Sequence, residues 1–250
     1  SVMNYCNPRY NNDGKLSDPG VLKEQVSRML ADDRAKTLSQ DFAGQWLNLA
    51  KLDEMTPNGG LFRHASRSLD PRPMFKEELN LFIDSVLRSD QPVTKLLDAD
   101  YTFLNERLAM HYGIGDVKGS RFRKVTLEDP RRHGLLGKGA ILMLTANPNR
   151  TAPVLRGAWI LDRILGTPPA EPPPGVEDFP ENGVGQVPKT VRERLEQHRA
   201  NPSCNSCHGV MDPLGLALEN FDTVGQFRAV DSDTLTAIDT SGVLPDGTPI

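Results

Sequence analysis

The stretch NPSCNSCHGVMDPLGLALENFDTVGQFR, residues 201–228, holds two of the chain's three cysteines and one of its five histidines within five positions. Cys204, Cys207 and His208 form the pattern C-x-x-C-H. The regions before and after this motif differ in character. A long part with helical periodicity precedes it, and a short apolar segment follows it.

The spacing of this motif is typical of a covalent haem c attachment site. Two thiols three positions apart on one turn of backbone can form thioethers with the two vinyl groups of a porphyrin, and the histidine after the second thiol then lies beneath the iron. We therefore predict one covalent haem c, with thioethers at Cys204 and Cys207 and with His208 as the proximal ligand of its iron. An accidental match is expected roughly 0.0007 times in a chain of this composition and length.

Three other interpretations of the motif stay open. A thioredoxin-like dithiol needs a βαβ context, whereas a predicted helix and Asn201-Pro202 precede this motif. A zinc site could use the motif together with His198, but the adjacent Cys207 and His208 point in different directions. Inert buried thiols beside a chance histidine are the third alternative. The covalent haem is the interpretation that the spacing favours.

Four nearby residues are candidates for further contacts with the haem. Arg199 can pair with a propionate, because a guanidinium binds a carboxylate through two hydrogen bonds. Met211 follows His208 by three positions, so on a helix it lies on the proximal side and packs against the porphyrin; a role as distal ligand is the alternative. Leu214 begins an apolar stretch expected to keep water from the porphyrin. His198 is a second candidate metal ligand, on the distal side, or else a cap for its own helix.

The remaining candidates for the distal ligand are weaker. His64, His111 and His133 are isolated in sequence, and such histidines are more often surface or satisfied core residues. Met143 lies in an apolar segment and is most simply a core residue. Of the neighbouring polar residues, Thr151 is predicted to cap a helix, Arg150 and Arg156 to meet propionates or a partner domain, and Asp212, Glu219 and Asp222 to be caps or salt-bridge partners.

Composition narrows the class of protein. A net charge of −4, without a run of more than two Lys or Arg, argues against nucleic-acid binding. No apolar run approaches the ~18 residues needed to cross a bilayer, so no transmembrane segment is expected.

Cys6 is predicted to be a free thiol or part of an intermolecular bridge. The start at Ser1 and the turn-forming Asp246-Gly247 suggest a piece of a longer, processed chain.

Apolar periodicity predicts a mainly α fold with few short strands. Helices are expected at about 17–30, 35–50, 71–89, 98–113, 135–145, 153–165 and 189–199, and a strand at 121–127. The first three helices are expected to bury these faces: Leu22, Val26, Met29 and Leu30; Leu38, Phe42, Trp46 and Leu49; Phe75, Leu79, Phe82, Ile83 and Val86.

Proline content suggests the domain organisation. Seven prolines lie between Pro168 and Pro188, which predicts a stiff, extended connection. We therefore expect a multi-helix body at 1–166 and a Pro-rich linker or wrapping loop at 167–188. A small cytochrome c-like, haem-bearing segment is expected at 189–250, truncated at its C-terminal end.

Several blocks resemble a set of bacterial domain families without an assigned activity, abundant in Planctomycetes and their relatives, that carry a C-x-x-C-H haem c motif and accompany planctomycete-type cytochrome c domains. The blocks are GKLSDPGVLKEQVSRMLADDRA, FAGQWLNL, LLDADYTFLNERLAMHYGI, GLLGKGAILMLTANPNRTAPVLRGAWILDRILGTPP and LEQHRANPSCNSCHGVMDPLGLALENFDTVGQFR. The resemblance implies a periplasmic or cell-surface location in a bacterium, and a longer parent chain with flanking domains.

The predicted function is electron transfer through one haem c, within a larger extracytoplasmic redox protein or assembly. Its partners would be a redox protein or other cytochrome domains. One alternative is a haem enzyme of the peroxidase or oxidase kind, with an open distal position on the iron. Another is an envelope binding or scaffold module in which the haem is structural.

Overall fold

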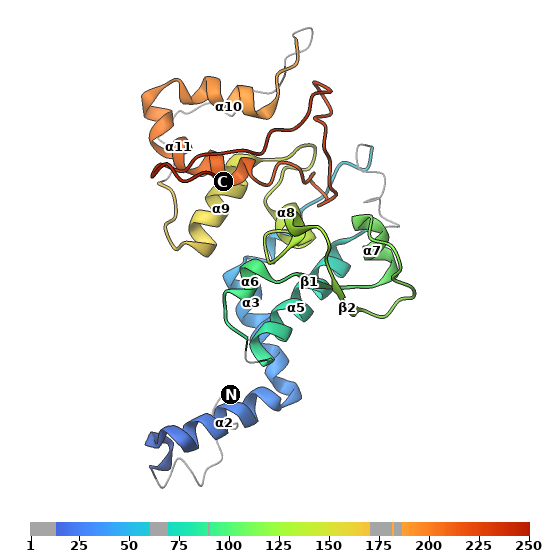
Figure 1. The fold of residues 1–250 in the computed structure, drawn as a ribbon, viewed down its shortest axis with the longest axis vertical. Coiled ribbons are helices and arrows are strands. Elements are labelled where there is room, and N and C mark those ends of the chain that lie inside the picture. Colours follow the sequence, from blue (N-terminus) through green and yellow to red (C-terminus); the bar gives the residue numbers. More distant parts are fainter. Residues whose placement is uncertain (1–13, 61–69, 90, 171–181, 183–186) are drawn as a thin grey trace.

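The computed structural model describes residues 14–60, 70–89, 91–170, 182 and 187–250 (Figure 1). Its described part contains ten α-helices and one sheet of two strands, so the predicted mainly α fold is confirmed. The α-helices are α2 (Pro19–Ala31), α3 (Ala43–Trp46), α4 (Lys51–Glu54), α5 (Arg72–Arg88), α6 (Lys95–Asp98), α7 (Glu106–Tyr112), α8 (Gly139–Leu144), α9 (Pro153–Trp159), α10 (Val191–Arg199) and α11 (Pro202–Leu216). Short 3₁₀ turns are η2 (Lys15–Ser17), η3 (Asp33–Ala35) and η7 (Pro130–Arg132), and π-helical turns are η4 (Leu38–Phe42) and η8 (Ile160–Ile164).

Helix α5 is central to the main core, where it packs against η4, α6, α8 and strand β1 (Figure 1). All five apolar residues predicted for its inner face are buried: Phe75, Leu79, Phe82, Ile83 and Val86. The prediction succeeds because these residues recur at the spacing of one helix face. The same face also buries Glu78, whose carboxylate accepts hydrogen bonds from Thr102 Oγ1 and Tyr112 Oη at 2.6 Å each.

Buried charges surround Glu78. Its pKa is raised by burial, and Lys138, which is also inaccessible to solvent, has its pKa lowered by burial to about 8. The Lys138 ammonium lies 4.3 Å from the Phe82 ring centroid, so a cation–π contact offsets part of the cost of its burial. Arg132 is stacked on the Tyr112 ring at 4.0 Å. The core of the helical body therefore contains a polar network that the apolar pattern did not predict.

The segment 98–113 was predicted to be one helix, and this prediction is wrong in its first half. Tyr101–Leu104 form strand β1, which pairs antiparallel with β2, Arg123–Thr126, in the register Tyr101 to Thr126. Helix α7 begins only after Asn105, whose side chain caps the amide of Leu108 at 2.9 Å. Thr102 is buried beside Glu78, and this tertiary contact favours the extended backbone over the helical one. The strand predicted at 121–127 is confirmed at its centre.

The two N-terminal helices differ from the prediction. Leu22 and Val26 of α2 are about half exposed, because in the described part of the chain this helix contacts chiefly its neighbours η2 and η3. Figure 1 shows α2 extending away from the rest of the fold. The cap of α2 is Asp18, whose side chain accepts from the amides of Gly20 and Val21. The helix predicted at 35–50 is divided into η4 and α3 and gives way to a turn at 47–50, before a separate α4. Leu38 and Phe42 are exposed.

The two later helices of the body occur where the sequence predicts them, although α8 is shorter than expected. All six residues of α8 are buried, which includes Met143, expected as a core residue. Helix α9 begins at Pro153 without a side-chain cap, so the predicted capping role of Thr151 is wrong. The helical path then continues through η8 to Ile164, close to the predicted end at 165.

The C-terminal part of the chain is joined to the helical body by buried contacts. His111 Nε2 lies 2.7 Å from the carbonyl oxygen of Val224, and Arg132 donates to the carbonyl of Gly225 at 2.9 Å. Residues 217–250 form turns and isolated antiparallel bridges, one of them between Val243 and Pro249 around the predicted Asp246-Gly247 turn. Most of the Pro-rich stretch lies outside the described residues, so the domain boundaries stay a prediction.

Candidate functional site

Two consecutive helices position the C-x-x-C-H motif. Helix α10 begins with a capping box, in which Thr190 and Glu193 each bond the backbone of the other. Asn201 then caps α11 by accepting from the amide of Ser203 at 3.0 Å, with Pro202 as the first helical residue. A proline is favourable at this position because the first amides of a helix have no intrahelical partner. The Asn201-Pro202 turn thus ends one helix and starts the next.

The motif occupies the first two turns of α11. Figure 1 shows this helix close to α9 and α10. At about 3.6 residues per turn, Cys204, Cys207 and His208 stand at i, i+3 and i+4 and share one side of the helix. Both thiols are half-buried and neither forms a disulfide. A porphyrin held by both sulfurs would therefore lie along the side of the helix that also carries the imidazole. The residue types and their spacing on the helix match those that the predicted group requires.

His208 lies in a cluster of polar side chains from both helices. Its Nδ1 is 2.9 Å from Asp212 Oδ1, one turn further along α11. Arg199 Nε approaches the other carboxylate oxygen of Asp212 at 3.7 Å. The imidazole rings of His198 and His208 meet edge to face, with centroids 4.6 Å apart. Burial and the neighbouring His208 lower the pKa of His198 below its ordinary value of 6.5.

This geometry bears on the roles predicted for His198 and Arg199. The structure brings both residues close to the motif. The ring of His198 is in direct contact with the ring of His208. No space is therefore left between the two rings for a planar macrocycle. A role as distal ligand would require the two rings to separate. Arg199 pairs with Asp212, so contact with a propionate would have to share or replace this ion pair.

Met211 and Leu214 belong to the packed part of α11. The helix crosses α9 with the two backbones in contact: a Cβ added at Gly157 would lie 1.9 Å from the Met211 carbonyl oxygen. Met211 is buried and stands one turn after His208 on the same helix, and its predicted contact with the porphyrin stays a prediction. Leu214 is partly buried against the main core, as is Leu218. The apolar side chains after the motif thus pack largely against the rest of the protein.

The acidic residues expected to be caps or salt-bridge partners are found in those roles. Asp222 Oδ1 accepts from the amides of Val224 and Gln226, at 2.9 and 2.8 Å. Glu219 accepts from Thr151 Oγ1 at 2.5 Å and forms ion pairs with Arg156 and Arg228.

One of the arginines was assigned the wrong role. Arg156 is fully buried and donates to the carbonyls of Leu218 and Asp222, at 2.8 and 3.1 Å. It is therefore unable to meet a propionate or a partner domain. Arg150 is half-buried, and its expected role stays a prediction.

The isolated histidines that the structure describes are satisfied within the fold. His111 is buried against the Val224 carbonyl, and His133 Nε2 lies 3.1 Å from the Leu127 carbonyl. His64 and Cys6 lie outside the described residues. Among the residues that are described, no group of three or more His, Cys, Asp or Glu is placed to hold a metal ion. The zinc alternative thus receives no support there, whereas a haem would take its first iron ligand from His208 alone.

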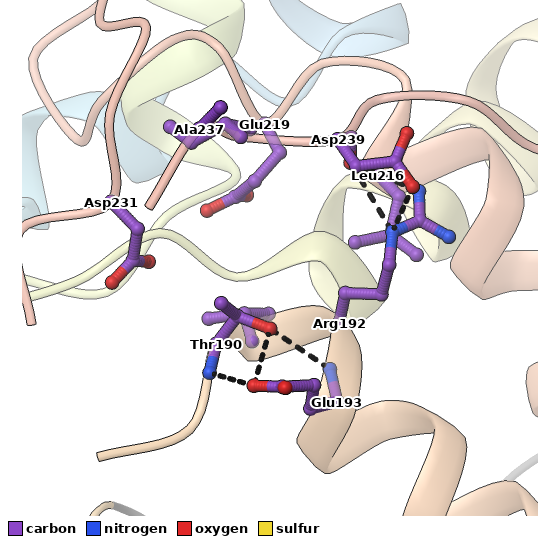
Figure 2. Close-up of a pocket in the computed structure, with 10 residues that line it drawn as sticks. Thr190, Arg192, Glu193, Leu216, Glu219, Asp231, Ala237 and Asp239 are labelled. Carbon is purple, nitrogen blue, oxygen red and sulfur yellow. Dashed lines mark hydrogen bonds and ion pairs between the residues drawn. The ribbon is translucent and has the colours of Figure 1, made fainter. Parts of the chain in front are cut away.

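A separate hollow lies between the start of α10 and residues 231–239 (Figure 2). Its cavity volume is about 220 Å³, and its lining includes Thr190, Glu193, Glu219 and Asp231. Figure 2 shows the Thr190–Glu193 capping box and the Arg192–Asp239 ion pair at its border. This volume is below the range of roughly 300–1,000 Å³ usual for ligand pockets. None of its lining residues belongs to the motif.

The chain is similar to two families. The model of a protein of unknown function (DUF1592), named PSD4, matches residues 9–114. The model of a second protein of unknown function (DUF1588), named PSCyt3, matches residues 132–231, a range that includes the C-x-x-C-H motif. These names suggest planctomycete cytochrome-associated domains, in agreement with the resemblance found in the sequence. No curated protein and no solved structure matches the chain. No helix in the described part of the chain has the length and apolar character needed to cross a membrane.

Proposed function

We propose that this chain carries one covalent haem c and transfers electrons through it. Cys204 and Cys207 would hold the porphyrin by thioethers, and His208 Nε2 would bind the iron. When bound, this group supplies a one-electron couple between ferric and ferrous iron. The observation that carries the proposal is the placement of both half-buried thiols and the imidazole on one side of α11.

The protein's own residues contribute rigidity and charge. Close contact of α11 with α9, at Gly157 and Gly215, fixes the helix that bears the motif. A fixed ligand reduces the reorganisation that must accompany a change in the charge of the iron. The Arg199 guanidinium and the Asp212 carboxylate place opposite charges beside the imidazole.

The location and partners belong to the same proposal. The C-x-x-C-H motif and the name of the family that matches it support a redox assembly, within which a second cytochrome domain or a redox protein would exchange electrons with this chain. We place this assembly outside the cytoplasm as part of the same proposal. The helical body, far larger than one haem needs, would provide the docking surface.

Expression of the full chain in a bacterial periplasm, together with a cytochrome c maturation system, tests the proposal. Wild-type protein is expected to retain haem on a denaturing gel and to show a Soret band that persists after acid–acetone extraction. Cys204→Ala together with Cys207→Ala should lose both signals. Cys6→Ser is the matched control, because it removes the third cysteine and should keep them. Protein of apoprotein mass without a Soret band would overturn the proposal.

Cyanide distinguishes electron transfer from the enzyme alternative. A six-coordinate iron gives low-spin bands that cyanide does not shift, and this result is expected for an electron carrier. A high-spin ferric spectrum that changes on addition of cyanide would show an open coordination position and would favour a haem enzyme.

A further inference from the structure

Asp212 is a buried carboxylate with an unusual set of partners. Its side chain is fully inaccessible to solvent. Oδ1 contacts His208 Nδ1 at 2.9 Å, and Oδ2 is buried without a hydrogen-bond partner among the described residues. Burial of a carboxylate is costly unless it is paired and hydrogen-bonded. The contact with His208 is thus the principal hydrogen bond that compensates Asp212.

The chemistry of this contact fixes the tautomer of the imidazole. An ionised carboxylate only accepts hydrogen bonds, so an ionised Asp212 requires the proton on Nδ1 of His208. In a neutral imidazole Nε2 then carries the lone pair. That nitrogen is the one available to a metal. The two residues stand at i and i+4 on α11, so the helix itself holds the pair in register.

The neighbouring groups leave the contact between Asp212 and His208 in place. The Arg199 guanidinium lies 3.7 Å from Oδ2, on the side away from His208 Nδ1. This distance is beyond a hydrogen bond but within range of an ion pair. The His198 ring packs edge to face with the His208 ring, with the two ring planes at 72°. The imidazole of His208 thus has a carboxylate at one nitrogen and a second ring packed against it.

We propose that Asp212 is a positioning residue for the axial imidazole, which orients His208 Nε2 toward the iron, increases the electron donation of the ring and so lowers the reduction potential of the haem. This inference rests on the proposed haem site. Carboxylates that accept from the second nitrogen of a ligating histidine fix its orientation and raise its basicity. A more basic ligand stabilises the ferric form more than the ferrous form, because the ferric iron has the higher charge.

A first test needs no haem. In the full chain purified without haem, ¹⁵N-resolved long-range NMR correlations report which ring nitrogen of His208 carries the proton. The wild type is expected to show the Nδ1-protonated tautomer at a pH where the ring is neutral. Asp212→Ala should revert to the Nε2-protonated form that is common in free histidine. An Nε2-protonated ring in the wild type would overturn the proposal.

A second test measures the reduction potential of the haem-loaded protein. Asp212→Asn keeps the size of the side chain and an acceptor oxygen but removes the charge. It is expected to raise the potential by about 59 mV, which corresponds to a tenfold change in the equilibrium between the two oxidation states for a one-electron couple. Asp222→Asn is the matched control: it also removes a partly buried negative charge after α11, but Asp222 caps the amides of Val224 and Gln226 instead of His208.

The outcomes separate the two proposals. A shift in Asp212→Asn that exceeds the shift in Asp222→Asn supports the positioning role. Equal shifts would mean that only net charge matters, and would overturn it. Wild-type protein without covalent haem would overturn the proposed function itself, and this result is visible before any variant is compared.

Discussion

The contact between α9 and α11 leads to a specific prediction, because the two backbones are too close for any side chain larger than that of glycine at position 215. A Cβ placed on Gly215 would lie 1.8 Å from the carbonyl oxygen of Pro153, and its nearest atoms are backbone. Gly215→Ala must therefore move the helices apart until this distance reaches ordinary contact, 3.4 Å or more. A backbone carbonyl cannot move away by changing a side-chain rotamer.

The size of the effect follows from two opposing terms. Alanine favours an isolated helix over glycine by up to ~1 kcal/mol. Overpacking at a close-packed contact costs roughly 1–3 kcal/mol and occasionally more. Met211 and Leu216 lie in the same interface segment and are buried, so their packing is disturbed as well. We expect a net loss of about 1–3 kcal/mol in the free energy of unfolding.

Gly209 supplies the control on the same helix. The three atoms nearest to an added Cβ there all belong to the Asn205 side chain, with Oδ1 at 3.2 Å, and this side chain can rotate away. Gly209→Ala should thus be neutral or stabilise by up to ~1 kcal/mol. Urea unfolding followed by circular dichroism at 222 nm compares the two variants. Equal midpoints for Gly215→Ala and Gly209→Ala would refute the close backbone contact.

Three further predictions concern buried polar groups. Because burial lowers the pKa of Lys138 to about 8 from 10.5, the unfolded chain binds more protons than the folded chain between these values, and the free energy of unfolding rises from pH 8 toward pH 10.5. Lys138→Met should flatten this rise when the free energy of unfolding is measured by urea titration at several pH values. An unchanged dependence on pH would show that Lys138 does not cause the rise. Glu219→Ala leaves the buried Arg156 without its carboxylate and should cost about 3–5 kcal/mol in thermal unfolding, with a loss below 1 kcal/mol as the contrary result. Trp46→Phe removes the 2.6 Å hydrogen bond from Nε1 to the Arg163 carbonyl and should cost about 0.5–1.5 kcal/mol in the same assay, whereas no change would show that water replaces it.

Elements with a strong local signal could be predicted from the sequence. The inner face of α5 and the buried segment of α8 were identified from apolar spacing, since each residue's burial follows from its place on one helix. The C-x-x-C-H motif was found for a similar reason. Three residues within one turn need no tertiary contact to share a side of the helix, so their spacing alone brings them together.

Features that depend on distant partners were missed. Tyr101–Leu104 has helical neighbours in sequence, and only pairing with β2 and burial beside Glu78 make it a strand. Leu22 and Val26 form an apolar stripe, but a stripe is buried only if another element covers it. Arg156 was predicted to meet a propionate or a partner domain because its actual partners lie more than sixty positions away in the chain. These partners are Glu219 and the carbonyls of Leu218 and Asp222.

The sequence by itself determined the helical class, the inner face of α5 and the placement of two thiols and an imidazole on one helical turn. These properties are local, because helix periodicity relates residues no more than a few positions apart. Tertiary structure alone decided which charges are buried, how closely α9 and α11 approach, and that His198 and Arg199 stand against His208 and Asp212. Such contacts join different helices, and the angle and distance between helices depend on packing that no short stretch of sequence encodes.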